Sequence, residues 1–325
     1  ETFELKRLVK FITDNFNGEE EIAIPVEIAK YMEDVKAALD EYNAGKLNDF
    51  AYWDKVASIR EAYRATVKLS ISGDEISVSR AHVNEIFSAF EAKIEKGIEK
   101  AIELGNGLVP TYLTHETTDF EPVVDENGEP VISHYGLQKV KVKAFKTVPL
   151  PYFLEGPARM MGYVDTDTAR EMFNKVKETG LYDQKLAMYK TSASIEECSM
   201  ENGRCRAFTP GWQERENVFL HMEYKYILAM LKAGLYDEYY ETITRALIPF
   251  LDPNMYGRST LENSSFLASS VNPNEDIHGR GFVARLSGST TEMISMWIEM
   301  FVGSKVFTYE DGKLVLNFEP KLANW

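Results

Sequence analysis

Two junctions in this sequence, each between a polar loop and an apolar helical pattern, hold the residue types that could do chemistry. The first junction reads GWQERENVFLH over residues 211–221. The second reads RLSGSTT over residues 285–291. Loops that lead into rigid helices often hold binding and catalytic residues. We therefore expect the functional site at these two junctions.

The second junction is suited to binding a phosphate group. A helix start presents unpaired backbone N–H groups and the positive end of the helix dipole. Ser287, Gly288 and Ser289 are small enough to leave room for an anion there. Arg280 and Arg285 add guanidinium groups, which bind phosphate or paired sugar hydroxyls in a bidentate manner. An alternative stays open, in which a serine only caps the helix and the arginines form surface ion pairs.

The first junction is suited to binding a sugar. Trp212 could stack on a pyranose ring, and Asn217 could hydrogen-bond to its hydroxyl groups. Asn263 lies in a further polar loop, residues 256–270, that could form another wall of the same pocket. His221 follows about one turn into the helical pattern, where a pocket-facing role and a buried structural role both fit the sequence.

Three carboxylates in these loops are candidates for a catalytic acid. They are Glu214, Glu216 and Glu262. Burial against an aromatic ring such as Trp212 could raise the pKa of one of them into the range of a useful proton donor. The sequence alone does not distinguish among the three.

Composition narrows the class of partner and the compartment. The 325 residues include 44% apolar residues, enough for a substantial core, and 51 acidic against 36 basic residues give a net charge of −15. This charge repels nucleic acid and anionic lipid, and no apolar run approaches the roughly 20 residues that span a bilayer. Cys198 and Cys205 favour a reducing compartment over a hairpin disulfide, and no further ligands at metal-binding spacing accompany them. We expect a cytoplasmic protein with no metal, no nucleic-acid partner and no membrane partner.

Helical patterns dominate the chain and must position these loops. They cover residues 25–42, 50–67, 79–104, 165–179, 216–232, 237–250 and 289–302. Alternating patterns predict a β-hairpin within residues 108–148 and another within residues 304–325. We predict a mainly α protein in which residues 1–303 form an α/α toroid of the six-hairpin type, complete or in part. The first hairpin is an insertion in this domain, and a plain helical domain stays open as the alternative.

The segments GWQERENVFLHMEYKY and ARLSGSTTEMISMWIEMFVG resemble the C-terminal part of the catalytic toroid in glycoside hydrolase family 94 and its relatives, the cellobiose-phosphorylase-like proteins. The similarity covers about residues 108–325 and is clearest over residues 208–303. In that family an aromatic-x-His motif at the start of an inner helix, and a Ser-Gly or Thr-Gly turn before a later helix, help to bind phosphate. The resemblance assigns the first motif to His221 and the second to Ser287 and Gly288.

The resemblance implies a bacterial enzyme that cleaves β-linked oligosaccharides by inverting phosphorolysis. Inorganic phosphate, as co-substrate and without any other cofactor, attacks the anomeric carbon while a carboxylic acid protonates the leaving oxygen. The product is a sugar 1-phosphate, so a glycosyl group is transferred to phosphate. The family's general acid lies in an upstream Asp-Trp-Asn-Asp motif, and this chain has only Tyr52, Trp53 and Asp54 in its upstream third. We therefore expect the C-terminal part of a longer enzyme, with a homodimer among the assemblies it could form.

Two other classes of function stay open. An inverting glycoside hydrolase on the same scaffold would need two carboxyl groups about 6.5–9.5 Å apart and no phosphate. A non-catalytic glycan-binding domain would bind sugar without turnover. Dependence on phosphate separates both of these from a phosphorylase.

Overall fold

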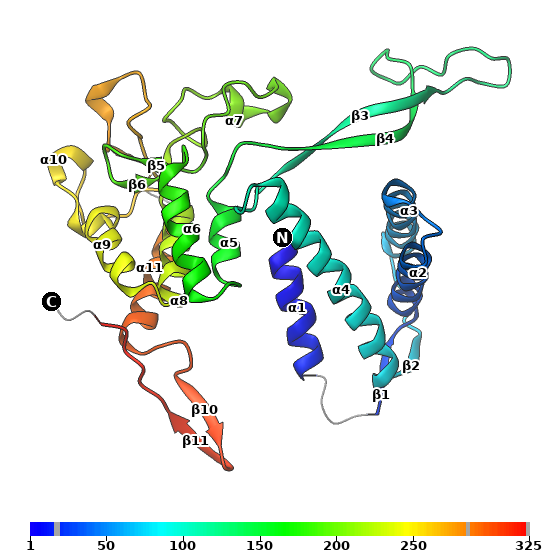
Figure 1. The fold of residues 1–325 in the computed structure, drawn as a ribbon, viewed down its shortest axis with the longest axis horizontal. Coiled ribbons are helices and arrows are strands. Elements are labelled where there is room, and N and C mark those ends of the chain that lie inside the picture. The colour runs from blue at the N-terminus through cyan, green and yellow to red at the C-terminus, as the bar shows by residue number, and fades with distance from the viewer. Residues whose placement is uncertain (16–19, 284–286, 323–325) are drawn as a thin grey trace. The chain divides into compact units, whose positions relative to one another are not determined.

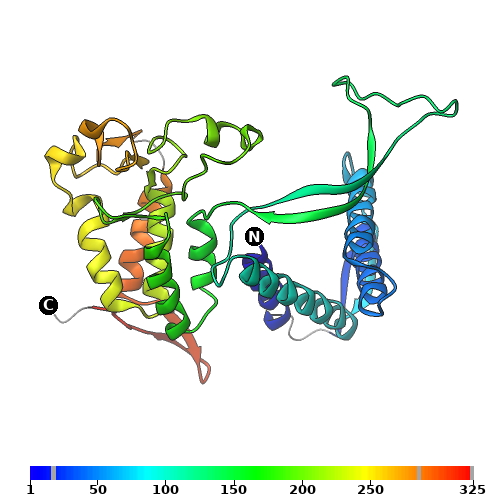
Figure 2. The ribbon, with the colours of Figure 1, turned by 45° about the horizontal axis from the view of Figure 1, so that its top comes forward.

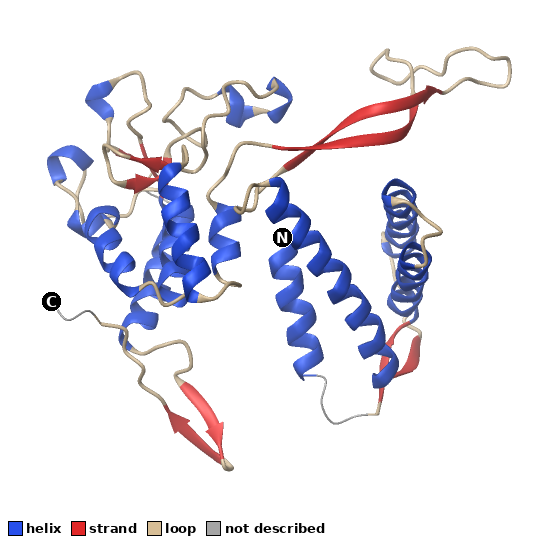
Figure 3. Ribbon diagram, viewed as in Figure 1, coloured by secondary structure: helices blue, strands red, loops and turns tan. Residues whose placement is uncertain are grey.

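The computed structural model describes residues 1–15, 20–283 and 287–322 of the chain. About 48% of the protein is helical and the sheets are small and antiparallel, so the fold is mainly α with small β additions, as predicted (Figure 1, Figure 3). The chain divides into two compact units. The first comprises residues 1–100 and 114–148, and the second comprises residues 101–113 and 149–325. The first hundred residues thus belong with the hairpin of residues 114–148, and the C-terminal hairpin belongs to the second unit.

Four helices and two short strands build most of the first unit. They are α1 (Thr2–Asn15), β1 (Glu21–Pro25), α2 (Val26–Asn43), α3 (Asp49–Val67), β2 (Glu75–Ser79) and α4 (Arg80–Leu104). Helices α2 and α3 pack against each other as a hairpin, with the rings of Tyr31 and Tyr63 stacked 4.7 Å apart. The Ser79 hydroxyl accepts a hydrogen bond from the His82 N–H (3.3 Å) and so caps the start of α4.

The hairpin predicted within residues 108–148 is a long ribbon of two strands, β3 (Leu113–Pro122) and β4 (Val140–Pro149). The Asp125 carboxylate accepts hydrogen bonds from the N–H groups of Asn127 and Glu129, at 2.8 and 2.9 Å, and these bonds close a turn. The hairpin predicted within residues 108–148 is therefore present. The patterns missed α1 and the β1–β2 pair, whose partners lie 50 positions apart at Pro25 and Glu75 and 58 positions apart at Glu21 and Ser79.

Five helices form the body of the second unit, and the remaining elements are short. The longer helices are α5 (Glu155–Met161), α6 (Thr166–Glu178), α8 (Leu220–Lys232), α9 (Tyr236–Ala246) and α11 (Ser287–Phe301). The short helices are η1 (Met200–Asn202), α7 (Arg204–Ala207), η2 (Ile248–Phe250), α10 (Pro253–Tyr256) and η3 (Glu275–Ile277). The strands are β5 (Tyr182–Asp183), β6 (Met188–Tyr189), β7 (Val218–Phe219), β8 (Phe266–Leu267), β9 (Gly281–Phe282), β10 (Phe307–Glu310) and β11 (Lys313–Leu316).

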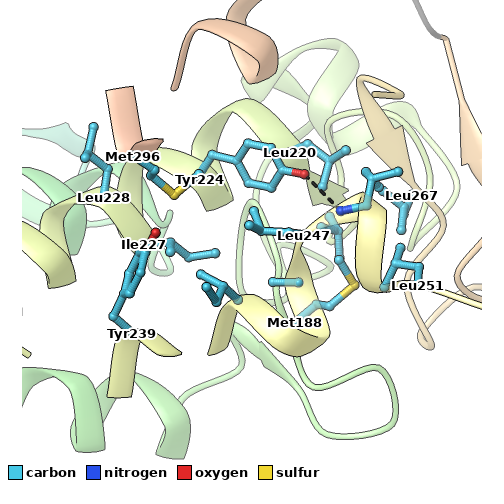
Figure 4. Packing of buried hydrophobic residues seen from close by; sticks show 14 of the residues in the cluster. Met188, Leu220, Tyr224, Ile227, Leu228, Tyr239, Leu247, Leu251, Leu267 and Met296 are labelled. Atoms are coloured by element: carbon cyan, nitrogen blue, oxygen red, sulfur yellow. Dashed lines mark hydrogen bonds between the residues drawn. The ribbon is translucent and has the colours of Figure 1, made fainter. Parts of the chain in front are cut away.

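Helix α8 is the centre of the second unit's core. Leu220, Ile227 and Leu231 are fully buried on it, and Met296 of α11 packs into the same cluster (Figure 4). The buried Tyr224 hydroxyl accepts a hydrogen bond from the Ile248 N–H at 3.3 Å. Each fully buried Leu or Ile side chain contributes about 1.5–3 kcal/mol, so this cluster anchors the start of α8.

The long loops of the second unit gather at one end of its helices, and the β10–β11 hairpin lies at the other end (Figure 1, Figure 2). Cys198 and Cys205, both in these loops, are free thiols. Within the described ranges, no helix combines the length and the apolar character needed to cross a bilayer. The loop end of the helices is where both predicted junctions lie.

Candidate functional site

A small three-stranded sheet brings the two predicted junctions together. Strand β8 pairs with β7 on one side and with β9 on the other, with Phe266 opposite both Phe219 and Phe282. Both pairings are antiparallel, so β7 and β9 run in the same direction. The chain leaves β7 directly into α8, and α11 begins at Ser287, five positions after the end of β9. The starts of α8 and α11 therefore lie at the same end of this sheet.

The ring of His221 packs directly on the main chain of Gly288. A Cβ atom added at Gly288 would lie 2.5 Å from His221 Nδ1 and 2.7 Å from its Cγ, closer than real Cβ contacts. Only glycine fits beside this ring without displacing it. The other ring nitrogen, Nε2, lies 3.4 Å from Oε1 of Glu292, in the second turn of α11. The structure thus brings together two residues that are 67 positions apart in the sequence, His221 and Gly288.

Two helix N-termini converge beside His221. Helices α8 and α11 pack against each other and run in the same direction, because His221 meets the first turns of α11 while Met296 packs in the cluster of Leu228. The first N–H groups of a helix have no acceptor within the helix, and the dipole makes this end positive. No side chain caps α8. The dipoles of both helices therefore favour an anion at this end of the sheet, although the whole protein carries a net charge of −15.

Two buried hydroxyl groups at this end of the sheet have no hydrogen-bond partner among the described residues. They belong to Ser289 and Ser265, whose side chains are 1% exposed. Ser265 is located by its main chain, since its N–H donates to the carbonyl of Val283 (2.6 Å) and its carbonyl accepts from the N–H of Leu220 (3.0 Å). Buried polar groups are normally paired. The two serines are therefore exceptions among the buried polar groups of the described residues.

Aromatic rings follow one another across the sheet from Trp212 to His221. Trp212 stacks on Phe282 at 3.7 Å, and Phe266 lies 5.5 Å from Phe282 and 4.7 Å from Phe219. Phe219 in turn meets His221 edge to face at 5.9 Å. Phe282 covers one face of Trp212, so the opposite face is the one left for a sugar ring. We call these five rings the aromatic row.

The loop before β7 is held in an unusual backbone conformation. Gln213 and Glu216 both have positive φ angles, 55° and 53°, which side chains other than glycine seldom adopt. Gly211 also has a positive φ, and a Cβ atom there would lie 2.6 Å from the main-chain nitrogen of Asn272. Arg215, 4% exposed, secures the loop by donating to the carbonyls of Arg206 (2.8 Å) and Phe208 (2.9 Å). Strained, over-determined loops of this kind are common at functional sites.

The three candidate carboxylates lie in different surroundings. Glu214 pairs with the guanidinium of Arg204 through two bonds of 2.9 and 3.0 Å, and Glu262, exposed, pairs with Arg258 at 3.1 Å. Glu216 is buried, and its nearest cation is Nε of Arg215 at 3.8 Å. Among the three, Glu216 is the carboxylate held away from solvent.

Two buried ionisable groups near Glu216 were missed by the sequence patterns. Burial lowers the pKa of Lys190, although the charges of Glu216 and Asp183 oppose this effect. Burial raises the pKa of Glu223 in α8 to about 8. Oε1 of Glu223 accepts the N–H of Tyr189 at 2.8 Å, and Oε2 has no partner among the described residues. Glu223 is therefore mostly a neutral acid at pH 7. In the sequence, the feature that could have indicated it is a glutamate within an otherwise apolar helical pattern.

The other candidate sugar-binding residues are partly engaged in the fold. Asn217 is fully buried; its Oδ1 accepts from the Thr191 hydroxyl (3.0 Å) and its Nδ2 donates to the carbonyl of Val218 (3.1 Å). Asn263 precedes β8, at the same end of the sheet as His221, and its Oδ1 lies 3.5 Å from the hydroxyl of Tyr224. Asn263 thus lies at the end of the sheet where α8 and α11 begin, whereas Asn217 lies at the opposite end.

Within the described part of the chain, neither candidate arginine contributes a guanidinium group at the start of α11. Arg280 precedes β9, at the opposite end of that strand from the start of α11, and is exposed, with Nε donating to the carbonyl of Asp276 at 3.2 Å. Arg285 lies outside the described residues. Ser287 contributes the first residue of α11, and its side chain is also outside the description.

No protein-family model matches this chain, and no curated protein matches its sequence. Among the described residues, no three His, Cys, Asp or Glu side chains gather as a metal ion would require.

Proposed function

We propose that the second unit binds inorganic phosphate at the start of α11 and belongs to an enzyme of inverting phosphorolysis. The observation that carries the proposal is the packing of the His221 ring on Gly288, at a helix N-terminus. The convergence of α8 and α11 supports it, because an oxyanion at this position would be attracted by both helix dipoles.

The aromatic row supports a β-linked oligosaccharide as the second substrate. It connects the proposed phosphate position to Trp212, whose free face could stack on a sugar ring. In this proposal phosphate attacks the anomeric carbon from the side of α11 while the sugar lies along the row. The helices of the second unit then form part of an α/α toroid, with the loop end as its substrate-binding face.

Glu216 is the candidate general acid that the surroundings favour. Each of the three carboxylates has an arginine within 4 Å, but Glu216 alone among them is buried, in a strained loop that leads into β7. In the reaction, a phosphate oxygen forms a bond to the anomeric carbon as the glycosidic C–O bond breaks. The acid donates its proton to the leaving oxygen, so that an α-sugar 1-phosphate and a shortened oligosaccharide are released.

The test is a phosphorus NMR assay of the chain with phosphate and either cellobiose or a short β-glucan. We expect a sugar 1-phosphate signal that is absent in His221→Ala and retained in His134→Ala, which alters an exposed histidine of the first unit. Release of reducing sugar independent of phosphate would instead identify a hydrolase. Sugar binding without any product would identify a glycan-binding domain.

A further inference from the structure

Glu292 is the charged side chain that faces His221. Among the described residues it is the one within ion-pair distance of the ring, with Oε1 3.4 Å from Nε2. Its carboxylate is 17% exposed, so water screens this contact only partly. From the neighbouring elements, Gly288 of α11 and Phe219 of β7 also touch the ring, and neither carries a charge.

We infer that Glu292 is a positioning residue that holds His221 with Nδ1 directed at the start of α11. The inference rests on the proposed phosphate site and extends it. The carboxylate lies at ion-pair distance from Nε2 and attracts a proton on that nitrogen. Nδ1 is the nitrogen nearest to Gly288, at the helix start. The two ring nitrogens of His221 thus lie next to two different turns of α11, Nδ1 at Gly288 and Nε2 at Glu292.

This arrangement determines which form of the ring binds an anion. With Nε2 protonated, Nδ1 donates a hydrogen bond only when the ring is an imidazolium cation. A phosphate oxygen at the start of α11 and the carboxylate of Glu292 would then stabilise the same cation from its two sides. The coupling is reciprocal, since whatever favours the cation favours binding of the anion.

The direction in which Glu292→Gln changes phosphate affinity distinguishes a positioning role from simple repulsion between Glu292 and phosphate. If Glu292 acted only as a nearby negative charge, then Glu292→Gln would bind phosphate more tightly. If Glu292 holds the cationic ring in place, the same substitution weakens binding. We expect a loss of up to about fivefold, the size that follows from losing a partly exposed ion pair. Glu292→Asp keeps the charge and should restore part of the affinity.

The experiment combines calorimetric titration of inorganic phosphate with nitrogen NMR of protein labelled in its five histidines. The proteins are the wild type, Glu292→Gln, Glu292→Asp, His221→Ala and the control Glu171→Gln, which alters an exposed residue of α6. In the wild type with phosphate, both ring nitrogens of His221 should show the shifts of a protonated imidazole. In Glu292→Gln these shifts should move toward those of a neutral ring.

The outcomes are distinguishable. Absence of phosphate binding in the wild type would overturn the proposed function itself and this inference with it. Binding that is lost in His221→Ala and unchanged or tighter in Glu292→Gln would overturn the role of Glu292 alone. Weaker binding in Glu292→Gln with an unchanged His221 spectrum would also overturn it, because the effect would then not act through the ring.

Discussion

Glu223 is fully buried in α8, and its replacement by glutamine should remove a defined part of the pH dependence of stability. Burial raises the pKa of this carboxyl from 4.5 to about 8 in the folded protein. Between these two pH values the folded chain therefore holds one more proton than the unfolded chain. The contribution of Glu223 to stability is fully present below about pH 4.5 and is lost as the pH rises toward 8.

The magnitude follows from the linkage relation. One additional bound proton changes the free energy of unfolding by about 1.4 kcal/mol per pH unit. Between pH 5 and pH 7.5, Glu223 should therefore remove about 3 kcal/mol of stability from the wild type. Glutamine has the shape of the neutral acid and can still accept the N–H of Tyr189, but it does not titrate. Glu223→Gln should consequently gain about 3 kcal/mol relative to the wild type over this range.

The assay is urea unfolding of the wild type and Glu223→Gln at a series of pH values from 5 to 8. The control is Glu171→Gln, whose carboxyl is exposed on α6. Only the difference between each variant and the wild type is compared, since the other ionisable groups are common to both. Parallel curves for the wild type and Glu223→Gln would refute the reasoning, because they would mean that Glu223 is not a neutral buried acid in the folded protein.

Three further predictions follow from the geometry. Gly288→Ala should reduce phosphate affinity at least about tenfold and lower the free energy of unfolding by about 1–3 kcal/mol, because the new Cβ would displace the His221 ring; calorimetry and urea unfolding measure the two effects. Trp212→Ala should weaken cellobiose binding by about 1 kcal/mol or more while Trp212→Phe retains most of it, as measured by calorimetry; equal loss in both would argue against ring stacking. Leu231→Ala should lower the free energy of unfolding by about 2–5 kcal/mol, because Leu231 is fully buried in the α8 cluster; a loss below 1 kcal/mol would contradict this description of the core.

Local patterns in the sequence predicted most of the helices. Capping residues precede two of these helices. Ser79 accepts a hydrogen bond from the N–H of His82 at the start of α4, and Asp165 accepts from the N–H groups of Asp167 and Thr168 at the start of α6. These signals are local, since a capping residue and its partner lie within three positions. The same is true of the Asp125 turn in the β3–β4 ribbon.

The pattern placed the start of α8 too early because the competing structure is not local. The predicted helix begins at Glu216, but Glu216 has a positive φ and Val218 pairs with Leu267 in β8. That partner lies in a separate loop, and no periodicity near Val218 indicates it. Tertiary pairing therefore decided where the helix begins.

The sequence indicated several residues of the candidate site, but it did not indicate which of them are in contact. His221 and Gly288 were both identified from sequence, while their packing depends on the three-stranded sheet. The carboxylate of Glu292 acquires its significance only from this packing. Arg280 was expected beside phosphate because it is close in sequence to α11, yet β9 separates it from the helix start.

Calorimetric titration of inorganic phosphate at low ionic strength, into the wild type and His221→Ala, tests the central claim most directly. The account predicts saturable binding to one site in the wild type and no measurable binding in His221→Ala, with both proteins equally folded by circular dichroism. Equal binding to the two proteins would contradict it, because phosphate would then bind away from the junction of His221 and Gly288.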